Sequence, residues 1–154
     1  MEQLVNLLRR NHPGLLFVLG SKASWAPATK QVTYTSEETD TAIWTVLHEL
    51  GHALLGHTTY ASDLHLLRIE TAAWEKAITL AEQYKVSPIH NDHIQDCLDT
   101  YRDWLHKRST CPTCGDHGIQ PSEHLYHCLN CQNTWKVSSA RFCRPYRLKT
   151  AQIA

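Results

Sequence analysis

The sequence predicts an α+β fold in two parts. Residues 1–107 should form a small N-terminal sheet with packed helices, and residues 108–154 a small cysteine-rich domain. Three observations support this prediction. Apolar residues at helical spacing surround residues 48–52. Short runs rich in β-branched residues precede them. After residue 107 the helical pattern gives way to two closely spaced pairs of cysteines.

Residues 2–11 are predicted to form a short helix, which the sequence His12-Pro13-Gly14 ends. Residues 15–19 and 31–35 are apolar or alternate with β-branched residues, and both are predicted strands. Trp25 is a candidate for a third strand, which the nearby Pro27 confines to a sheet edge or a loop.

A long helix is predicted over residues 36–55, with Thr35 as N-cap, Glu38 completing a capping box and Gly56 as the C-terminal stop. Apolar residues at spacings of three and four give this helix a buried face. They are Ile43, Val46, Leu47, Leu50 and Leu54.

Two further helices are predicted. Ser62 can cap the first, over residues 63–85. Ser87 and Pro88 offer an N-cap and a first helical position for the second, which runs to residue 107. Cys97 lies on its apolar face and is predicted to be a core residue.

Composition narrows the classes of protein. At 154 residues with 42% hydrophobic content, the chain suits one modest globular domain with an appendage. No apolar run approaches roughly 18 residues, and no basic segment precedes an apolar core at the N-terminus. We therefore expect no membrane span, no secretory signal and a cytoplasmic location. In such a chain, clustered cysteines indicate metal binding rather than disulfides.

The charge is unevenly placed. Residues 1–105 carry 8 Lys+Arg and 13 Asp+Glu, for a net charge of −5, whereas residues 106–154 carry 7 and 2, for a net charge of +5. The basic end permits contact with nucleic acid or with an acidic partner. Its last part is a candidate basic arm, containing Arg141, Arg144, Tyr146, Arg147 and Lys149.

The segment His48-Glu49-Leu50-Gly51-His52 fits the pattern H-E-x-x-H. Histidines at i and i+4 lie on one helix face, so both imidazoles can reach one metal ion. A catalytic zinc ion takes three protein ligands and keeps one position for water. Glu49 follows the first histidine and can serve as the general base that accepts a proton from that water.

The third metal ligand must come from another part of the chain. The candidates are Glu70, Glu75, His57, Asp63 and His65. If the helix after Asp63 returns antiparallel to the metal helix, Glu70 lies about 10 Å along it, opposite His52, at a rise of about 1.5 Å per residue. Glu75 would lie about 7–8 Å further along. Glu70 is therefore the predicted ligand.

The four cysteines Cys111, Cys114, Cys128 and Cys131 follow the pattern C-x₂-C-x₁₃-C-x₂-C. Each C-x₂-C directs two thiolates to one ion, and two such pairs complete a closed tetrahedral site. We expect a structural zinc ion in a zinc ribbon that folds only with its metal. The predicted ribbon core is Leu125, Tyr126, Trp135 and Val137. Cys143 has no evident partner.

Residues 48–57, HELGHALLGH, lie in a predicted helix after a short sheet and resemble the ImmA/IrrE metallopeptidases, which are zincins. That family continues with a segment close to E-A-N-x-F-A, whose Glu is the third zinc ligand. Glu70 and Trp74 match that segment, whereas Thr71, Ala72 and Glu75 depart from it. The resemblance covers about residues 1–105. It implies a cytoplasmic zinc endopeptidase that cleaves a helix-turn-helix repressor, with His48, His52 and Glu70 as ligands.

Other functions remain open at this stage. SprT-like proteases, which act on DNA-bound proteins, also pair an H-E-x-x-H helix with a C-terminal zinc ribbon, but their histidine third ligand has no match here. A non-catalytic adaptor that binds nucleic acid or protein through its ribbon is the alternative from another class. Candidates for stabilising an oxyanion are His57, Tyr60, His65 and His90. The sequence gives neither the substrate nor the oligomeric state.

Overall fold

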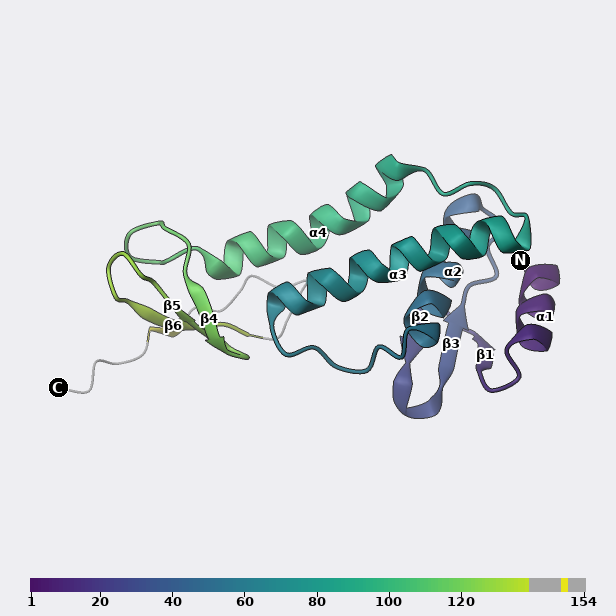
Figure 1. The fold of residues 1–154 in the computed structure, drawn as a ribbon, viewed down its shortest axis with the longest axis horizontal. Coiled ribbons are helices and arrows are strands. Elements are labelled where there is room, and N and C mark those ends of the chain that lie inside the picture. Colours follow the sequence, from purple (N-terminus) through teal and green to yellow (C-terminus); the bar gives the residue numbers. More distant parts are fainter. Residues whose placement is uncertain (139–147, 150–154) are drawn as a thin grey trace. The chain divides into compact units, whose positions relative to one another are not determined.

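The computed structural model describes residues 1–138 and 148–149 (Figure 1). These residues form an α+β fold with four α-helices and two small sheets, which confirms the α+β class that the sequence predicts. The chain divides into two compact units, residues 1–59 with 68–95 and residues 60–67 with 96–154. The division proposed at residues 107–108 stays a prediction.

The elements, in chain order, are α1 (Glu2–Asn11), β1 (Leu16–Leu19), β2 (Ser24–Ala26), a 3₁₀ turn (Pro27–Thr29), β3 (Gln31–Tyr34), α2 (Asp40–Leu54), α3 (Asp63–Tyr84), α4 (Asn91–Ser109), β4 (Ile119–Ser122), β5 (Leu125–His127), β6 (Thr134–Lys136) and β7 (Leu148–Lys149).

The sheet of the first unit has the order β1-β3-β2. β1 pairs with β3 in parallel, and β2 pairs with β3 antiparallel, so β2 is an edge strand. Pro27 ends β2 and opens the 3₁₀ turn, as expected for a residue that has no N–H to donate to a ladder. Both predicted strands are present, and Trp25 lies in the edge strand.

The start of α2 corrects the sequence analysis. The helix begins at Asp40, and its N-cap is Thr39, whose Oγ1 accepts a hydrogen bond from the N–H of Ala42 at 3.2 Å. The capping box predicted for Thr35 and Glu38 is therefore wrong. Both threonines are able to cap a helix, and the local pattern does not distinguish between them.

The next helix, α3, begins where the sequence predicts. The hydroxyl of Ser62 accepts a hydrogen bond from the N–H of His65 at 3.1 Å, which satisfies one of the free donors of the first turn. The helix then runs for 22 residues and carries Glu70 at its eighth position.

The last helix, α4, begins later than predicted, at Asn91 instead of Pro88. Ser87, the predicted cap, has other partners. Its hydroxyl donates to the carboxylate of Asp40 at 2.7 Å, and its carbonyl accepts the indole N–H of Trp44 at 3.0 Å. The segment before α4 is thus tied to the start of α2, a tertiary contact that sequence periodicity does not contain.

The core of the first unit contains one face of α2 and one face of α3. Its buried apolar side chains on these helices are Trp44, Val46, Leu47 and Leu50 on α2 and Ala73, Trp74, Ala77, Leu80, Ala81 and Tyr84 on α3. Side chains in close-packed interiors occupy fixed rotamers. The polar side chains that share these faces are therefore held in place by the same packing.

The second sheet has the order β4-β5-β6-β7 and is antiparallel throughout. Its core is a cluster of Cys111, Tyr126, Cys128, Trp135 and Val137. Leu125 is only half-buried and lies outside this cluster, which corrects its predicted place in the core. Two of the five core residues are cysteines of the group that could hold a metal ion. The predicted dependence of the folding of this unit on metal stays a prediction.

Some predicted features lie outside the described residues, namely Cys143 and the basic arm residues Arg141, Arg144, Tyr146 and Arg147. Cys97, predicted to be in the core, is half-buried.

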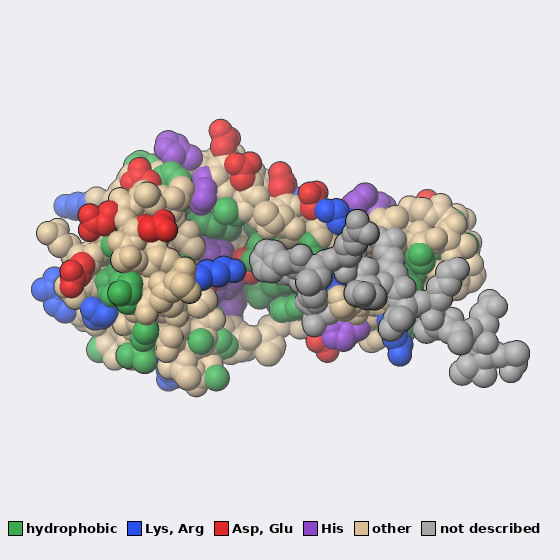
Figure 2. Space-filling model, turned by 180° about the vertical axis from the view of Figure 1, so that it is seen from behind, with side chains coloured by type: hydrophobic (Ala, Val, Ile, Leu, Met, Phe, Trp, Pro, Cys, Tyr) green, Lys and Arg blue, Asp and Glu red, His purple; other side chains and the backbone are tan. Residues whose placement is uncertain are grey.

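One face of α4 is acidic. The exposed residues Asp92, Asp96, Asp99 and Asp103 recur at spacings of three and four. Acidic side chains form a row along the upper edge of the view in Figure 2. Within the ranges that the structure describes, every helix falls short of the length and apolar character needed to cross a membrane.

Candidate metal centres

The two histidines of the H-E-x-x-H motif lie on the buried face of α2. His48 and His52 are 6% and 7% exposed, and their Nε2 atoms are 3.1 Å apart. The i, i+4 spacing places the two rings on one face of the helix, as predicted. The ring of His48 stacks on Trp74 of α3, with centroids 4.2 Å apart.

Glu70 of α3 is the carboxylate that the structure brings to this pair. Its Oε2 lies 3.2 Å from Nε2 of His48 and 3.5 Å from Nε2 of His52, and the residue is 7% exposed. Burial alone would raise the pKa of Glu70, but hydrogen bonds from the two histidines outweigh it and hold that pKa well below its ordinary value. Glu75, another carboxylate of α3 that was considered as a ligand, is exposed.

The spacing of these three atoms fits a metal ion. Ligand atoms at about 2.0–2.1 Å from a tetrahedral ion are separated from one another by about 3.3–3.4 Å. The three separations observed, 3.1, 3.2 and 3.5 Å, lie close to that value. His48, His52 and Glu70 therefore form a buried group that could hold a metal ion.

A close helix contact explains how Glu70 reaches the histidines. A Cβ built on Gly51 would lie 2.7 Å from the carbonyl oxygen of Ala73, so the backbones of α2 and α3 meet at this glycine. Ala73 lies about one helical turn beyond Glu70. The glycine of the motif thus sets the distance between the helix that carries the histidines and the helix that carries the carboxylate.

We expect Gly51→Ala to lower the free energy of unfolding, because the added methyl group meets a backbone oxygen that cannot rotate away, which costs about 1–3 kcal/mol. This loss should outweigh the gain of about 1 kcal/mol from the better helix propensity of alanine. The displaced α3 should also weaken metal binding at Glu70. Urea denaturation and metal titration measure both effects. Gly14→Ala is the control, since that site is open to at least 4 Å; equal stability of the two variants would contradict the contact.

Glu49 lies beside this group but is not part of it. Its carboxylate accepts a hydrogen bond from the backbone N–H of Trp25 in the edge strand β2. Burial is the largest influence on the pKa of Glu49 and raises it above the ordinary value, although His48 and His52 act in the opposite direction. A carboxylate with a raised pKa is a better proton acceptor at neutral pH.

The remaining candidate ligands have other partners. Asp63 accepts hydrogen bonds from Arg108 at 2.6 Å and from the hydroxyl of Tyr126 at 2.6 Å. His65 is exposed, and its Nδ1 accepts the N–H of Ala61. The choice of an oxyanion donor among the predicted residues His57, Tyr60, His65 and His90 stays a prediction.

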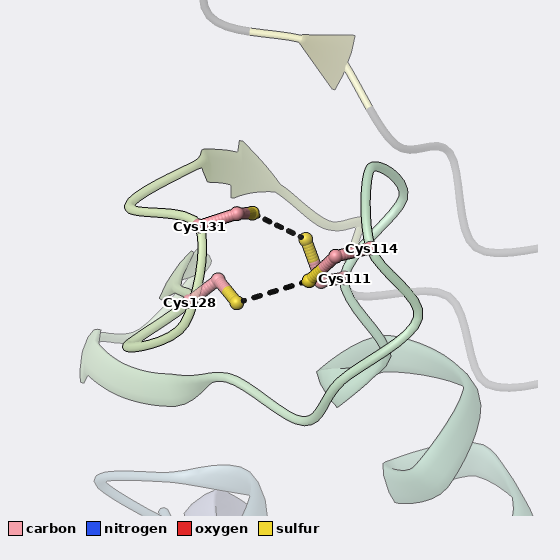
Figure 3. Close-up of side chains that lie close together, drawn as sticks. All are labelled: Cys111, Cys114, Cys128 and Cys131. Atoms are coloured by element: carbon pink, nitrogen blue, oxygen red, sulfur yellow. Dashed lines mark hydrogen bonds between the residues drawn. The ribbon is translucent and has the colours of Figure 1, made fainter.

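The second candidate metal group lies in the second unit (Figure 3). Cys111 and Cys114 come from the loop after α4, Cys128 and Cys131 come from the loop between β5 and β6, and the four thiols face one another. The Sγ atoms of Cys111 and Cys131 are 3.5 Å apart, as are those of Cys114 and Cys128. Disulfide sulfurs lie about 2.0 Å apart, whereas ligands of a tetrahedral ion with metal–sulfur bonds of about 2.3 Å lie about 3.8 Å apart.

Backbone donors support the thiolate form of Cys111. Burial raises the pKa of this thiol, but hydrogen bonds from the N–H groups of Cys114 and Thr113 outweigh burial and lower the pKa. A deprotonated thiol is the form that binds metal. Cys111, Cys114, Cys128 and Cys131 therefore form a second group that could hold a metal ion, as predicted.

Sequence reasoning did not find three features of the first centre. These are the helix contact at Gly51, the backbone donor at Trp25 and the contact between His52 and His57, whose Nδ1 atoms are 2.9 Å apart. The helix contact at Gly51 did have a signal in the sequence. A glycine inside a helix costs about 1 kcal/mol relative to alanine, so its presence there indicates a packing requirement.

Comparison of the chain with protein-family models, with curated proteins and with solved structures finds no match.

Proposed function

We propose that this chain is a zinc-dependent endopeptidase in which His48, His52 and Glu70 hold the catalytic metal and Glu49 is the general base. The main support for this proposal is the position of Glu49. Its half-buried carboxylate adjoins the ligand group without belonging to it, and its pKa is raised. A site that only stabilises the fold needs no such proton acceptor.

The donor set supports zinc. Two imidazoles and one carboxylate are a ligand set of catalytic zinc sites, which leave one coordination position open. When bound, zinc would polarise the scissile carbonyl and lower the pKa of the attacking water. The negative charge of Glu70, whose pKa is held low, would offset part of the charge of the metal at this buried ligand group.

In this mechanism Glu49 moves the proton. Its carboxylate accepts a proton from water as the new carbon–oxygen bond forms at the scissile carbonyl. It then delivers that proton to the amide nitrogen as the carbon–nitrogen bond breaks. The N–H of Trp25 holds the carboxylate in place through its hydrogen bond. Because the proton returns to the leaving amine, Glu49 is ionised again for the next cycle.

The resemblance to the ImmA/IrrE metallopeptidases extends the proposal to a substrate class. We propose a regulatory protein such as a helix-turn-helix repressor. The four-cysteine group is then the site of a second zinc ion, which is structural because a closed Cys₄ site keeps no position for water. The basic C-terminal part is the proposed region of contact with nucleic acid.

The full chain, purified with zinc, should contain two zinc ions and cleave peptides. We would measure metal content by mass spectrometry and cleavage with a library of unstructured peptides. A chelator should abolish cleavage, and added zinc should restore it. A single zinc ion that is lost when the four cysteines are replaced would contradict the proposal, as would iron in the first site. Two zinc ions without cleavage of any peptide would contradict the peptidase function alone.

A further inference from the structure

The second ring nitrogen of His52 has a partner of its own. Its Nε2 faces His48 and Glu70, whereas its Nδ1 lies 2.9 Å from Nδ1 of His57. The two ring centroids are 5.0 Å apart and the planes meet at 69°. A hydrogen bond between two ring nitrogens needs one N–H and one lone pair. One of the two histidines must therefore donate from Nδ1 and the other must accept there.

The proposed metal decides which histidine donates. A histidine ligand offers an unprotonated nitrogen to the ion, and the hydrogen bond of its other nitrogen fixes this tautomer. Because Nε2 of His52 faces the ligand group, the proton of His52 lies on Nδ1. His57 then accepts at its Nδ1 and carries its own proton on Nε2.

The backbone of His57 is fixed on both sides of this contact. Its N–H donates to the carbonyl of His52 at 3.0 Å, in a turn that passes through Gly56 at a φ of 68°. That left-handed conformation favours glycine and ends α2. The carbonyl of His57 accepts the indole N–H of Trp25 at 2.7 Å. The end of α2 and the edge strand β2 together place the imidazole of His57.

The other histidine ligand is held differently. The ring of His48 stacks on Trp74 at an angle of 29°. Among the described residues, Nδ1 of His48 is buried with no hydrogen-bond partner. Packing orients the ring of His48, whereas a hydrogen bond orients the ring of His52. A change in the side chain at position 57 should therefore act on His52 and leave His48 in place.

We propose that His57 is a positioning residue that accepts the Nδ1–H of His52 and so directs Nε2 of His52 toward the metal. This inference rests on the proposed metal site and adds a role that the motif itself does not assign. Hydrogen-bond partners of metal ligands typically contribute about 10–100-fold to metal affinity. The backbone bonds of His57 do not depend on its side chain, so variants at this position should fold.

The test compares His57→Leu with His57→Asn in the full chain. Leucine removes the acceptor, whereas the amide oxygen of asparagine can replace Nδ1. Chelator competition should show the zinc ion at His48, His52 and Glu70 bound about 10–100-fold more weakly in His57→Leu, with most of the affinity restored in His57→Asn. When no metal is bound at His48, His52 and Glu70, both variants should have the same free energy of unfolding as the wild type. His124→Leu, a change at an exposed histidine that is no candidate for the site, is the control.

If His57→Leu bound zinc at His48, His52 and Glu70 with wild-type affinity, the proposal would be overturned. Equally weak zinc binding in His57→Leu and His57→Asn would also overturn it. That result would mean that the His57 side chain acts through packing and not as a hydrogen-bond acceptor. Nitrogen NMR of the zinc-loaded wild type should find His57 neutral with its proton on Nε2, and a proton on Nδ1 would refute the assignment. Two bound zinc ions without cleavage would refute the peptidase function and leave this role of His57 intact.

Discussion

Replacing Glu49 with glutamine should lower the rate of peptide cleavage by about 10²–10⁴-fold, the usual contribution of a positioned general base. The amide has nearly the shape of the carboxylate but cannot accept the proton from water. Because Glu49 lies outside the ligand group, the variant should still bind two zinc ions. Peptide cleavage followed by mass spectrometry and metal analysis of the same sample measure the two quantities together.

Glu75→Gln is the matched control, because it makes the same change at an exposed carboxylate of α3. It should leave both cleavage and zinc content unchanged. Loss of one zinc ion from Glu49→Gln would identify Glu49 as a ligand instead of a base. Cleavage at the wild-type rate, with both zinc ions bound, would remove the role that the proposed mechanism gives to Glu49.

The parts of the site that follow from local periodicity could be predicted from the sequence. His48 and His52 share a helix face because they are four residues apart, and each C-x₂-C pair brings two thiols together for a similarly local reason. Glu70 lies 22 residues from His48, yet it could be placed, because the lengths of two successive helices determine where an antiparallel return brings their residues together.

Contacts that depend on the backbone of a distant element could not be predicted. The need for glycine at position 51 arises from the carbonyl of Ala73. The direction of the His57 ring depends on Trp25, which is 32 residues earlier in the sequence. Asp63 was a candidate metal ligand because carboxylates bind metals, but its partner Arg108 is 45 residues away. Charge and periodicity do not record which pairs of residues meet in space.

Arg108→Met should lower the free energy of unfolding of the second unit by about 3–5 kcal/mol, as expected when one partner of a buried ion pair is removed. Arg108 and Asp63 are 1% and 2% exposed in their side chains, and two guanidinium nitrogens lie 2.6 and 3.3 Å from the carboxylate. The guanidinium also donates to the carbonyl of Ser138 and stacks over Trp104 at 4.3 Å. Methionine would fill the space and leave the charge of Asp63 buried without its partner.

Arg102→Met is the matched control in the same helix. Arg102 pairs with Asp99 on the surface at 2.7 Å, and a pair of this kind contributes about 0.2–1 kcal/mol. Urea denaturation with the metal groups saturated by zinc would measure both variants. A loss for Arg108→Met no larger than that for Arg102→Met would show that the buried pair contributes no more than a surface pair.

A triple variant tests why the loss is large. Tyr126 donates its hydroxyl to Asp63 at 2.6 Å, so replacing Arg108 and Asp63 alone would leave that hydroxyl buried without an acceptor. Asp63→Val, Arg108→Met and Tyr126→Phe together remove all three polar groups with little change in total side-chain volume. Buried ion pairs replaced in this way are often as stable as the original or more so. The triple variant should therefore be more stable than Arg108→Met alone, because the cost arises from an unpaired buried charge and not from the loss of a strongly stabilising bond.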